Sequence, residues 1–335
     1  FHVVLSDFVW MLLFISSLTM FMAGLVANFE FDLKKIIALS TLSQLGLMIS
    51  ILALGDSLLT FFHLLMHALF KALLFMCAGC MIHNLNNCQD IRYMGSLIMF
   101  IPMTSVFFNI CNLSLCGLPF LSGFYSKDLI YGVVSMDYFN LYIYMIFYLS
   151  TGLTVTYSVR LLYYTMFYDF NSVVYFSLVD PKEMLSGMGG LIMLVILGGS
   201  IMSWLMFNTP YLVCLPMMMK LMVVLVLVMG VVIGYIFSAY SQNDMSKSLW
   251  GYNLMVFFSL MWNLNYLSIF GLTFYFLKFG EKYNSLIDQG WSEYYGSQAL
   301  FSSISKSSLL LQAVFYNNIK IFLTLFLFWV CLMFL

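Results

Sequence analysis

The chain has 335 residues, of which 63% are hydrophobic and only 8% charged, and its formal net charge is −1. Soluble globular proteins carry about 25% charged residues, so this composition excludes a soluble domain. A net charge this close to zero also gives no reason to expect nucleic acid as a partner.

Long apolar runs follow one another along the whole chain. A helix needs about 20 apolar residues to cross the roughly 30 Å hydrocarbon core of a bilayer. Runs of this length are helices, because in lipid a segment must pair its own backbone polar groups and barrel strands are about half as long. The sequence therefore predicts an all-α integral membrane protein, a polytopic helix bundle. The predicted spans are Phe8–Asn28, Lys35–Leu54, Leu58–His83, Leu97–Tyr131, Tyr138–Tyr168, Gly187–Phe207, Cys214–Tyr240, Leu249–Phe276 and Asn318–Leu335.

Residues 277–316 differ from these runs because they mix charged and apolar side chains. Ile287, Trp291 and Tyr294 recur at helical spacing among the charges. This pattern predicts an amphipathic helix that lies along a membrane surface or a partner protein. A long loop outside the membrane with one short helix is the alternative. The last run, residues 317–335, is expected to be a C-terminal anchoring span.

Few ionisable side chains lie deep within an apolar run, where a charge costs about 2.5–3.5 kcal/mol. Lys71 and Lys127 do so, and each needs an explanation. Lys220 and Arg160 lie close enough to the ends of their runs to reach the headgroups, so we expect them to snorkel. Lys34 stands where a span begins.

Lys71 belongs to a regular row with His63 and His67, each four residues from the next. At about 100° per residue, this spacing puts the three side chains on one helix face, roughly 6 Å apart. Histidine changes charge near neutral pH, and burial destabilises the charged form of lysine, so both can pass on a proton. We therefore predict a proton relay along this row, with water in the gaps. Metal binding by His-x-x-x-His and simple hydrogen bonding between helices are the alternatives.

Gly117, Pro119 and Gly123 interrupt the apolar run that carries Lys127. Proline removes a backbone donor and clashes with the preceding turn. We predict a discontinuous helix here, because irregular backbone at membrane depth is tolerated where it lines a wet cavity, and transporters place ion sites at such breaks. Asp128 is the candidate counter-charge for Lys127. Alternatively, the helix ends near Pro119 and leaves Lys127 at the membrane interface.

No motif for a nucleotide or a redox cofactor accompanies these residues. The sequence has no G-x-G-x-x-G, no phosphate-binding loop and no cysteine cluster suited to an iron–sulfur centre. Cys77 and Cys80 stand in C-x-x-C spacing, but no second pair exists, and we expect them to be buried apolar side chains. No cofactor and no metal are therefore expected in this chain.

Four stretches, in this order along the chain, resemble the antiporter-like membrane subunits of respiratory complex I. They are Asp32–Gly46, His63–Phe75, Gln89–Gly95 and Gly117–Asp128. The amphipathic stretch with Asp288 and Trp291, followed by a last span, resembles the lateral helix and C-terminal anchor of one member of that family. The resemblance runs along essentially the whole chain.

The resemblance implies a subunit that translocates protons in the mitochondrial inner membrane without binding NADH or quinone. Such a subunit is a non-redox component of NADH:ubiquinone reductase. The resemblance also implies that Lys71 is the central lysine, with His63 and His67 as relay partners. Lys127 would be the terminal lysine on the discontinuous helix, and Lys34 a further channel lysine.

By the same resemblance, residues 1–170 correspond to the second of two inverted five-helix repeats, and 171–276 to additional transmembrane helices. The first repeat of the family has no counterpart here, so we expect the chain to cover part of a longer subunit. The implied partners are other membrane-arm subunits, contacted partly through residues 277–316, and phospholipid. A stand-alone Na⁺/H⁺ antiporter of the same architecture and a purely structural membrane element stay open as alternatives.

Overall fold

The computed structural model describes residues 6–136, 141–172, 178–240, 251–316 and 318–334. Within these ranges the regular secondary structure is helical, and an isolated bridge between Asp32 and Asp90 is the only β-type pairing. Backbone contacts divide the chain into two compact units, Phe1–Trp262 and Asn263–Leu335.

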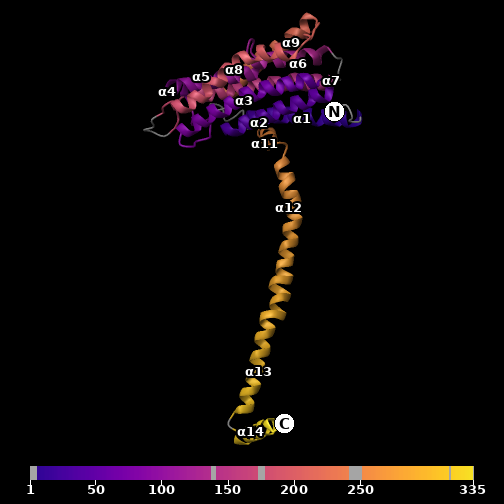
Figure 1. Ribbon diagram of the computed structural model, residues 1–335, viewed down its shortest axis with the longest axis vertical. Helices are drawn as coiled ribbons and strands as arrows, with labels where there is room; N and C mark the ends of the chain where they lie inside the picture. Colours follow the sequence, from indigo (N-terminus) through magenta and orange to yellow (C-terminus); the bar gives the residue numbers. More distant parts are fainter. Residues whose placement is uncertain (1–5, 137–140, 173–177, 241–250, 317, 335) are drawn as a thin grey trace. The chain divides into compact units, whose positions relative to one another are not determined.

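The first unit is a bundle whose long helices lie side by side (Figure 1). Its main helices are α1 (Ser6–Phe29), α2 (Leu33–Leu54), α3 (Ser57–Asn84), α5 (Pro102–Cys116), α6 (Ser122–Met136), α7 (Leu141–Leu162), α8 (Lys182–Met206) and α9 (Met217–Tyr240). α3 occupies the centre of the packing, since it contacts α2, α5, α6 and α8, while α1 and α9 pack against α7. Residues that point from α3 into the bundle are therefore surrounded by protein.

Six helices among the described residues are long and apolar enough to cross a membrane. They are α1, α2, α3, α8, α9 and α7 extended by the π-helical turn η1 (Tyr163–Phe167). Each coincides with a predicted span, because apolar length alone decides whether a helix can cross the hydrocarbon. The prediction of a polytopic helical membrane protein is confirmed.

The predicted break beside Lys127 is also confirmed. The run Leu97–Tyr131 is divided into a short helix α4 (Leu97–Phe100), then α5 and α6. α5 ends at Cys116 and is capped by Gly117, whose φ of 87° is in the left-handed region that glycine adopts without strain. The chain becomes helical again at Ser122. Lys127 therefore lies within a second half-helix, and not at an interfacial loop.

The predicted span Leu249–Phe276 is wrong as a single helix. Residues 249 and 250 lie outside the described residues, and α11 (Tyr252–Ser259) is only eight residues long. Met261, Trp262 and Asn263 then all have positive φ, which breaks the helix before α12 (Leu264–Tyr283) begins. A count of apolar residues misses this break, because Met and Trp are apolar whether or not their backbone is helical.

The second unit contains one extended helical segment. α12 continues through two π-helical stretches, η2 (Asn284–Trp291) and η3 (Tyr294–Gln298), into α13 (Ala299–Phe315). The segment predicted to be an amphipathic helix is thus helical rather than a loop, although its expected start at residue 277 falls inside α12. A further helix, α14 (Ile319–Met333), follows where the anchoring span is expected.

Two connections of the first unit are tied together by their backbones. The N–H of Leu33 donates to the carbonyl of Gln89 at 2.9 Å, and the N–H of Ile91 donates to the carbonyl of Phe31 at 3.0 Å. An ion pair of 2.6 Å between Lys35 and Asp32 lies beside this pairing. The turn between α1 and α2 is therefore held to the segment that follows α3.

Gly123 allows the two halves of the discontinuous helix to touch. A Cβ atom at Gly123 would collide with the backbone carbonyl of Ser114, which belongs to α5. Only the absence of a side chain lets α6 begin against the last turn of α5. Gly79 on α3 offers a comparison, because a Cβ atom there would meet nothing within 4 Å.

We predict that Gly123→Ala lowers the thermal midpoint of the assembled protein in detergent, because overpacking a close contact costs about 1–3 kcal/mol. Gly79→Ala is the matched control and is expected to be neutral or slightly stabilising, since alanine favours the helix. Equal midpoints for the two variants would contradict the close approach.

Candidate functional site

The predicted row on α3 is buried inside the bundle. His63, His67 and Lys71 are 0%, 8% and 4% exposed, although all three are polar. The imidazole rings of His63 and His67 have their centroids 6.3 Å apart. The four-residue spacing thus puts three ionisable groups on the face of α3 that the neighbouring helices cover.

Helix α2 supplies polar partners for both ends of this row. The ammonium of Lys71 donates to the hydroxyl of Ser40, and also to the carbonyl of Ile37 at 3.5 Å. At the other end, Nε2 of His63 lies 3.3 Å from Oε1 of Gln44. The row is therefore paired with neutral oxygen atoms and not with carboxylates.

Helix α6 reaches the same row through Ser126. The Ser126 hydroxyl lies 2.9 Å from Nδ1 of His63 and 3.2 Å from the carbonyl of Gly123. A neutral His63 can donate from Nε2 to Gln44 and accept the Ser126 proton at Nδ1. A charged His63 donates from both nitrogens, and Ser126 then turns its proton to Gly123. Both protonation states of His63 can thus be hydrogen-bonded.

Lys127 is buried beside the break, with 4% of its surface exposed. Its ammonium donates to the carbonyl of Leu115 at 2.5 Å. Carbonyls in the last turn of a helix lack intrahelical partners, and α5 ends one residue after Leu115. The discontinuity therefore creates the acceptor that holds this lysine. Gly117 lies beside its aliphatic stem, since Cδ of Lys127 is 3.6 Å from where a Cβ would stand, an ordinary contact distance.

His67 is the least satisfied member of the row. Its Nε2 atom is buried and has no hydrogen-bond partner among the described residues. The ring packs edge-on against Phe70, with centroids 5.3 Å apart. A buried polar nitrogen of this kind is usually paired with an ordered water.

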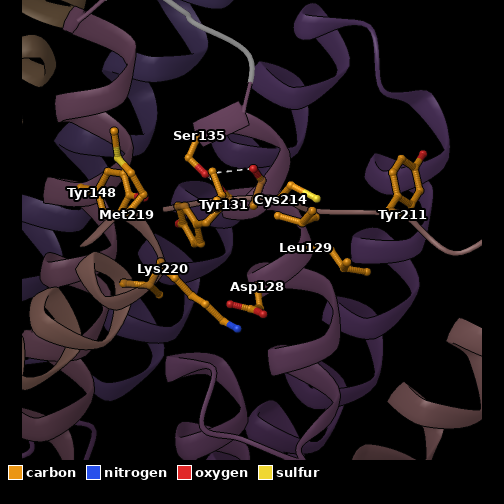
Figure 2. A pocket seen from close by; sticks show the side chains of 13 residues that line it. Asp128, Leu129, Tyr131, Ser135, Tyr148, Tyr211, Cys214, Met219 and Lys220 are labelled. Atoms are coloured by element: carbon orange, nitrogen blue, oxygen red, sulfur yellow. Dashed lines mark hydrogen bonds between the residues drawn. The ribbon is translucent and has the colours of Figure 1, made fainter. Parts of the chain in front are cut away.

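The sequence suggested Asp128 as the counter-charge of Lys127, but the structure does not pair these two side chains. Asp128 is exposed and lines a cavity of about 720 Å³ together with residues of α7 and α9, where the side chain of Lys220 extends toward its carboxylate (Figure 2). Lys220, which was expected to snorkel to the headgroups, is exposed in the first turn of α9 and also lines this cavity. Consecutive residues on a helix point in different directions, which is why Lys127 and Asp128 have different surroundings.

Lys34 is not brought into the buried row. It is exposed in the first turn of α2, one turn before Ile37, whose carbonyl accepts a hydrogen bond from Lys71.

Arg160 is a buried cation whose role the sequence did not reveal. It was expected to snorkel, but it is 7% exposed. Its guanidinium donates to the carbonyl of Asn28 and, at 2.8 Å, to that of Glu30, and it stacks over the ring of Phe31 at 4.9 Å. Arg160 thus holds the end of α1 to α7. Nothing local to Arg160 in the sequence indicates a partner so far along the chain.

The alternative of a metal site finds no support among the described residues, which contain no group of three or more His, Cys, Asp or Glu placed to hold an ion. The hydrogen-bond partners of His63 are the neutral side chains of Gln44 and Ser126. Cys77 and Cys80 are buried free thiols, as predicted.

The fold is similar to that of the solved structure of the Mrp complex from Dietzia sp. DQ12-45-1b. The TM-score is 0.59 with 17% sequence identity, over 90% of this chain and 34% of that chain. At this identity the likeness shows the fold alone. A family model described as NADH:quinone oxidoreductase/Mrp antiporter, TM, matches residues 1–154. The bundle with its discontinuous helix therefore has the fold of an antiporter-like membrane domain.

A second family model, NADH dehydrogenase subunit 5 C-terminus, matches residues 157–335, and the chain belongs to the NADH dehydrogenase subunit 5 family. Relatives named NADH-ubiquinone oxidoreductase chain 5 include those of Anopheles quadrimaculatus (52% identical over 98% of this chain), Locusta migratoria (49% over 98%) and Lumbricus terrestris (35% over 90%). The chain spans 58%, 58% and 53% of these relatives. The family resemblance is confirmed, and two of these three relatives are insect proteins.

We predict that Arg160→Met lowers the thermal stability of the assembled protein by about 1.5–3 kcal/mol, the usual loss for hydrogen bonds to a charged group. Arg92→Met is the control, because Arg92 is half exposed in its 3.4 Å ion pair with Asp90, and such pairs contribute about 0–1 kcal/mol. A shift for Arg160→Met no greater than the control's would show that the contacts with α1 contribute little.

Proposed function

We propose that this chain translocates protons as part of a membrane subunit of NADH:ubiquinone oxidoreductase in the mitochondrial inner membrane. The observation that carries the proposal is the buried set of His63, His67, Lys71 and Lys127, drawn from α3 and α6, which are linked by the contact between His63 and Ser126. Buried charges are expensive in a bilayer and commonly mark ion pathways. The family of the chain supports the same conclusion.

Electrostatic coupling gives this set a way to move protons. The charge of Lys127 acts on His63, His67 and Lys71. None of the four is hydrogen-bonded to a carboxylate in the described residues, so their positive charges repel one another without compensation. A proton arriving at one member therefore favours the loss of a proton from another, which is the behaviour that a relay requires.

His63 stands where the row on α3 meets the discontinuous helix. The hydroxyl of Ser126 can face either His63 or the carbonyl of Gly123, so the imidazole can gain and lose a proton without leaving a buried atom unpaired. Water at Nε2 of His67 would connect His63 with Lys71. In this scheme the protons pass between Lys71 and Lys127 by way of both histidines. The role of Lys34 rests on the family resemblance alone, and Asp128 was suggested only by its position next to Lys127.

Coupling to NADH oxidation must come from other subunits. Moving one charge against 100 mV requires about 2.3 kcal/mol, and no redox group is expected in this chain. The exposed apolar side chains of α12 and α13, including Phe270, Leu277, Phe301 and Leu309, are suited to contacts with other membrane-arm subunits and with phospholipid. The proposed parts of the chain would then be the repeat (residues 1–170), the additional helices (171–276), the lateral helix (277–316) and the anchor (317–335).

Lys71→Met and Lys127→Met, introduced into the full-length protein of the assembled complex, are each expected to reduce the protons pumped per NADH oxidised. Methionine keeps most of the volume of the lysine side chain and removes the amine that carries the proton. The measurement is the proton-to-electron ratio in reconstituted vesicles, with the exposed Lys182→Met as control. Wild-type ratios in both variants would defeat the proposal, and ion exchange by the isolated chain in liposomes would favour the antiporter alternative.

His67→Phe separates a relay from a structural role. Phenylalanine resembles imidazole in shape, and Nε2 of His67 has no protein partner to lose among the described residues. We expect assembly and thermal stability close to wild type, together with slower proton translocation. A variant that assembles and pumps normally would favour a purely structural row.

A further inference from the structure

An open groove of about 340 Å³ runs beside the discontinuous helix, lined by residues of both α7 and α9. From α9 it is lined by Lys220, Val224, Leu227 and Val231, which recur at intervals of three and four residues and therefore share one helix face. From residue 220 to residue 231 an α-helix rises about 16 Å. This is about half of the roughly 30 Å hydrocarbon core, so the groove has the length of one acyl chain in one leaflet.

The wall of the groove is apolar along most of this length. Val224, Val228 and Val231 are 54%, 55% and 46% exposed, on a helix that is long and apolar enough to cross a membrane. Two polar groups of the wall already bond each other, because Sγ of Cys116 lies 2.9 Å from the hydroxyl of Ser158. An occupant of this part of the groove therefore has to be apolar.

One end of the groove carries two opposite charges. Lys220 stands in the first turn of α9, near one end of this membrane-crossing helix, and Asp128 of α6 lines the same end. Both side chains are exposed, and that of Lys220 extends toward Asp128 (Figure 2). The two charges interact, but in the described part of the chain neither belongs to an ion pair. This end of the groove therefore offers an unpaired cation near an unpaired anion.

We propose that the groove is a binding site for phosphatidylethanolamine. The headgroup of this lipid carries a negative phosphate and a positive primary amine only a few bonds apart. The Lys220 ammonium donates to the phosphate, and the amine of the lipid donates to the Asp128 carboxylate; both are charge-assisted hydrogen bonds. One acyl chain lies along α9 from Lys220 toward Val231, and the other stays in the surrounding bilayer.

The two charges select among phospholipids, because specificity is a difference between affinities. The headgroup of phosphatidylcholine has the same two charges but no N–H, so it cannot donate to Asp128. Phosphatidylglycerol offers a phosphate to Lys220 but no cation, and its negative charge is repelled by Asp128. Ethanolamine is the one of these three headgroups that satisfies both side chains.

This site goes beyond the proposed function, because it assigns a lipid ligand and requires no proton to move. It nevertheless has a consequence for that function. The groove reaches Gly117, Pro119 and Lys127. An acyl chain in the groove covers this side of the helix break and keeps bulk water from reaching Lys127 from the groove.

The test uses photoactivatable phospholipids that carry a diazirine on the acyl chain. The full-length protein of the assembled complex is placed in phosphatidylcholine nanodiscs with a trace of the ethanolamine, choline or glycerol probe, and mass spectrometry locates the cross-links. We expect the ethanolamine probe to label residues 151–162 and 220–231 about threefold to fivefold more than the other probes, the factor that a solvent-accessible charge pair contributes. The exposed Leu194, Leu197 and Ile201 of α8 report the background of unspecific lipid contact.

Substitutions separate the two charges. Asp128→Asn should abolish the preference for the ethanolamine probe over the choline probe, whereas Lys220→Met should lower labelling by all three probes and Lys220→Arg should restore it. Val228→Trp fills the groove from an exposed position, so it should block labelling in a protein that still folds. Lys182→Met is the matched control, at an exposed lysine in the first turn of α8 that does not line the groove.

Equal labelling by the three probes, or an ethanolamine preference that survives Asp128→Asn, would indicate ordinary contact with bilayer lipid and overturn the site. Labelling that Lys220→Met leaves unchanged would do the same. Labelling no greater than that of α8 would also overturn it and would indicate that a neighbouring subunit covers the groove. These results do not depend on pumping: normal pumping by Lys71→Met and Lys127→Met would defeat the proposed function and leave the lipid site standing.

Discussion

A positive charge held away from water needs oxygen atoms around it, and this requirement organises the bundle. Lys127 takes the carbonyl of Leu115, which is available because α5 ends there. Lys71 takes the hydroxyl of Ser40 from α2. Arg160 takes the last carbonyls of α1. In each case the acceptor belongs to another helix or half-helix, so the same contact that satisfies a cation also fixes the packing of two elements.

The hydrogen-bond acceptors of Lys71 and Lys127 are neutral, and this distinguishes the two lysines from members of a structural ion pair. A carboxylate would hold the proton of an ammonium by its own charge and would lose its partner if the proton left. When the acceptor is a neutral carbonyl or hydroxyl, less interaction energy is lost if the proton of the ammonium leaves. His63 can in addition rearrange its hydrogen bonds through Ser126. Arginine, which rarely gives up its proton, serves at the end of α1, where only a fixed cation is needed.

The features that depend on local pattern could be predicted from the sequence. Apolar length marked six described spans, the i, i+4 spacing placed His63, His67 and Lys71 on one face, and Gly117 with Pro119 marked the break. The partners could not be predicted, because Gln44, Ser126 and Leu115 are brought to the site only by tertiary packing. The surroundings of Arg160 were misjudged for the same reason: distance from a helix end does not show which neighbour a long side chain meets.

The two π-helical stretches between α12 and α13 have a consequence for any surface that this segment binds. A π-helix closes its hydrogen bonds over five residues and so holds more residues in each turn than an α-helix. A stripe of side chains followed down α12 at the α-helical period is therefore offset where it continues into α13. A straight groove could not hold both stripes at once; a binding surface that engages the whole segment has to wind around it, or two separate partners must each take one half.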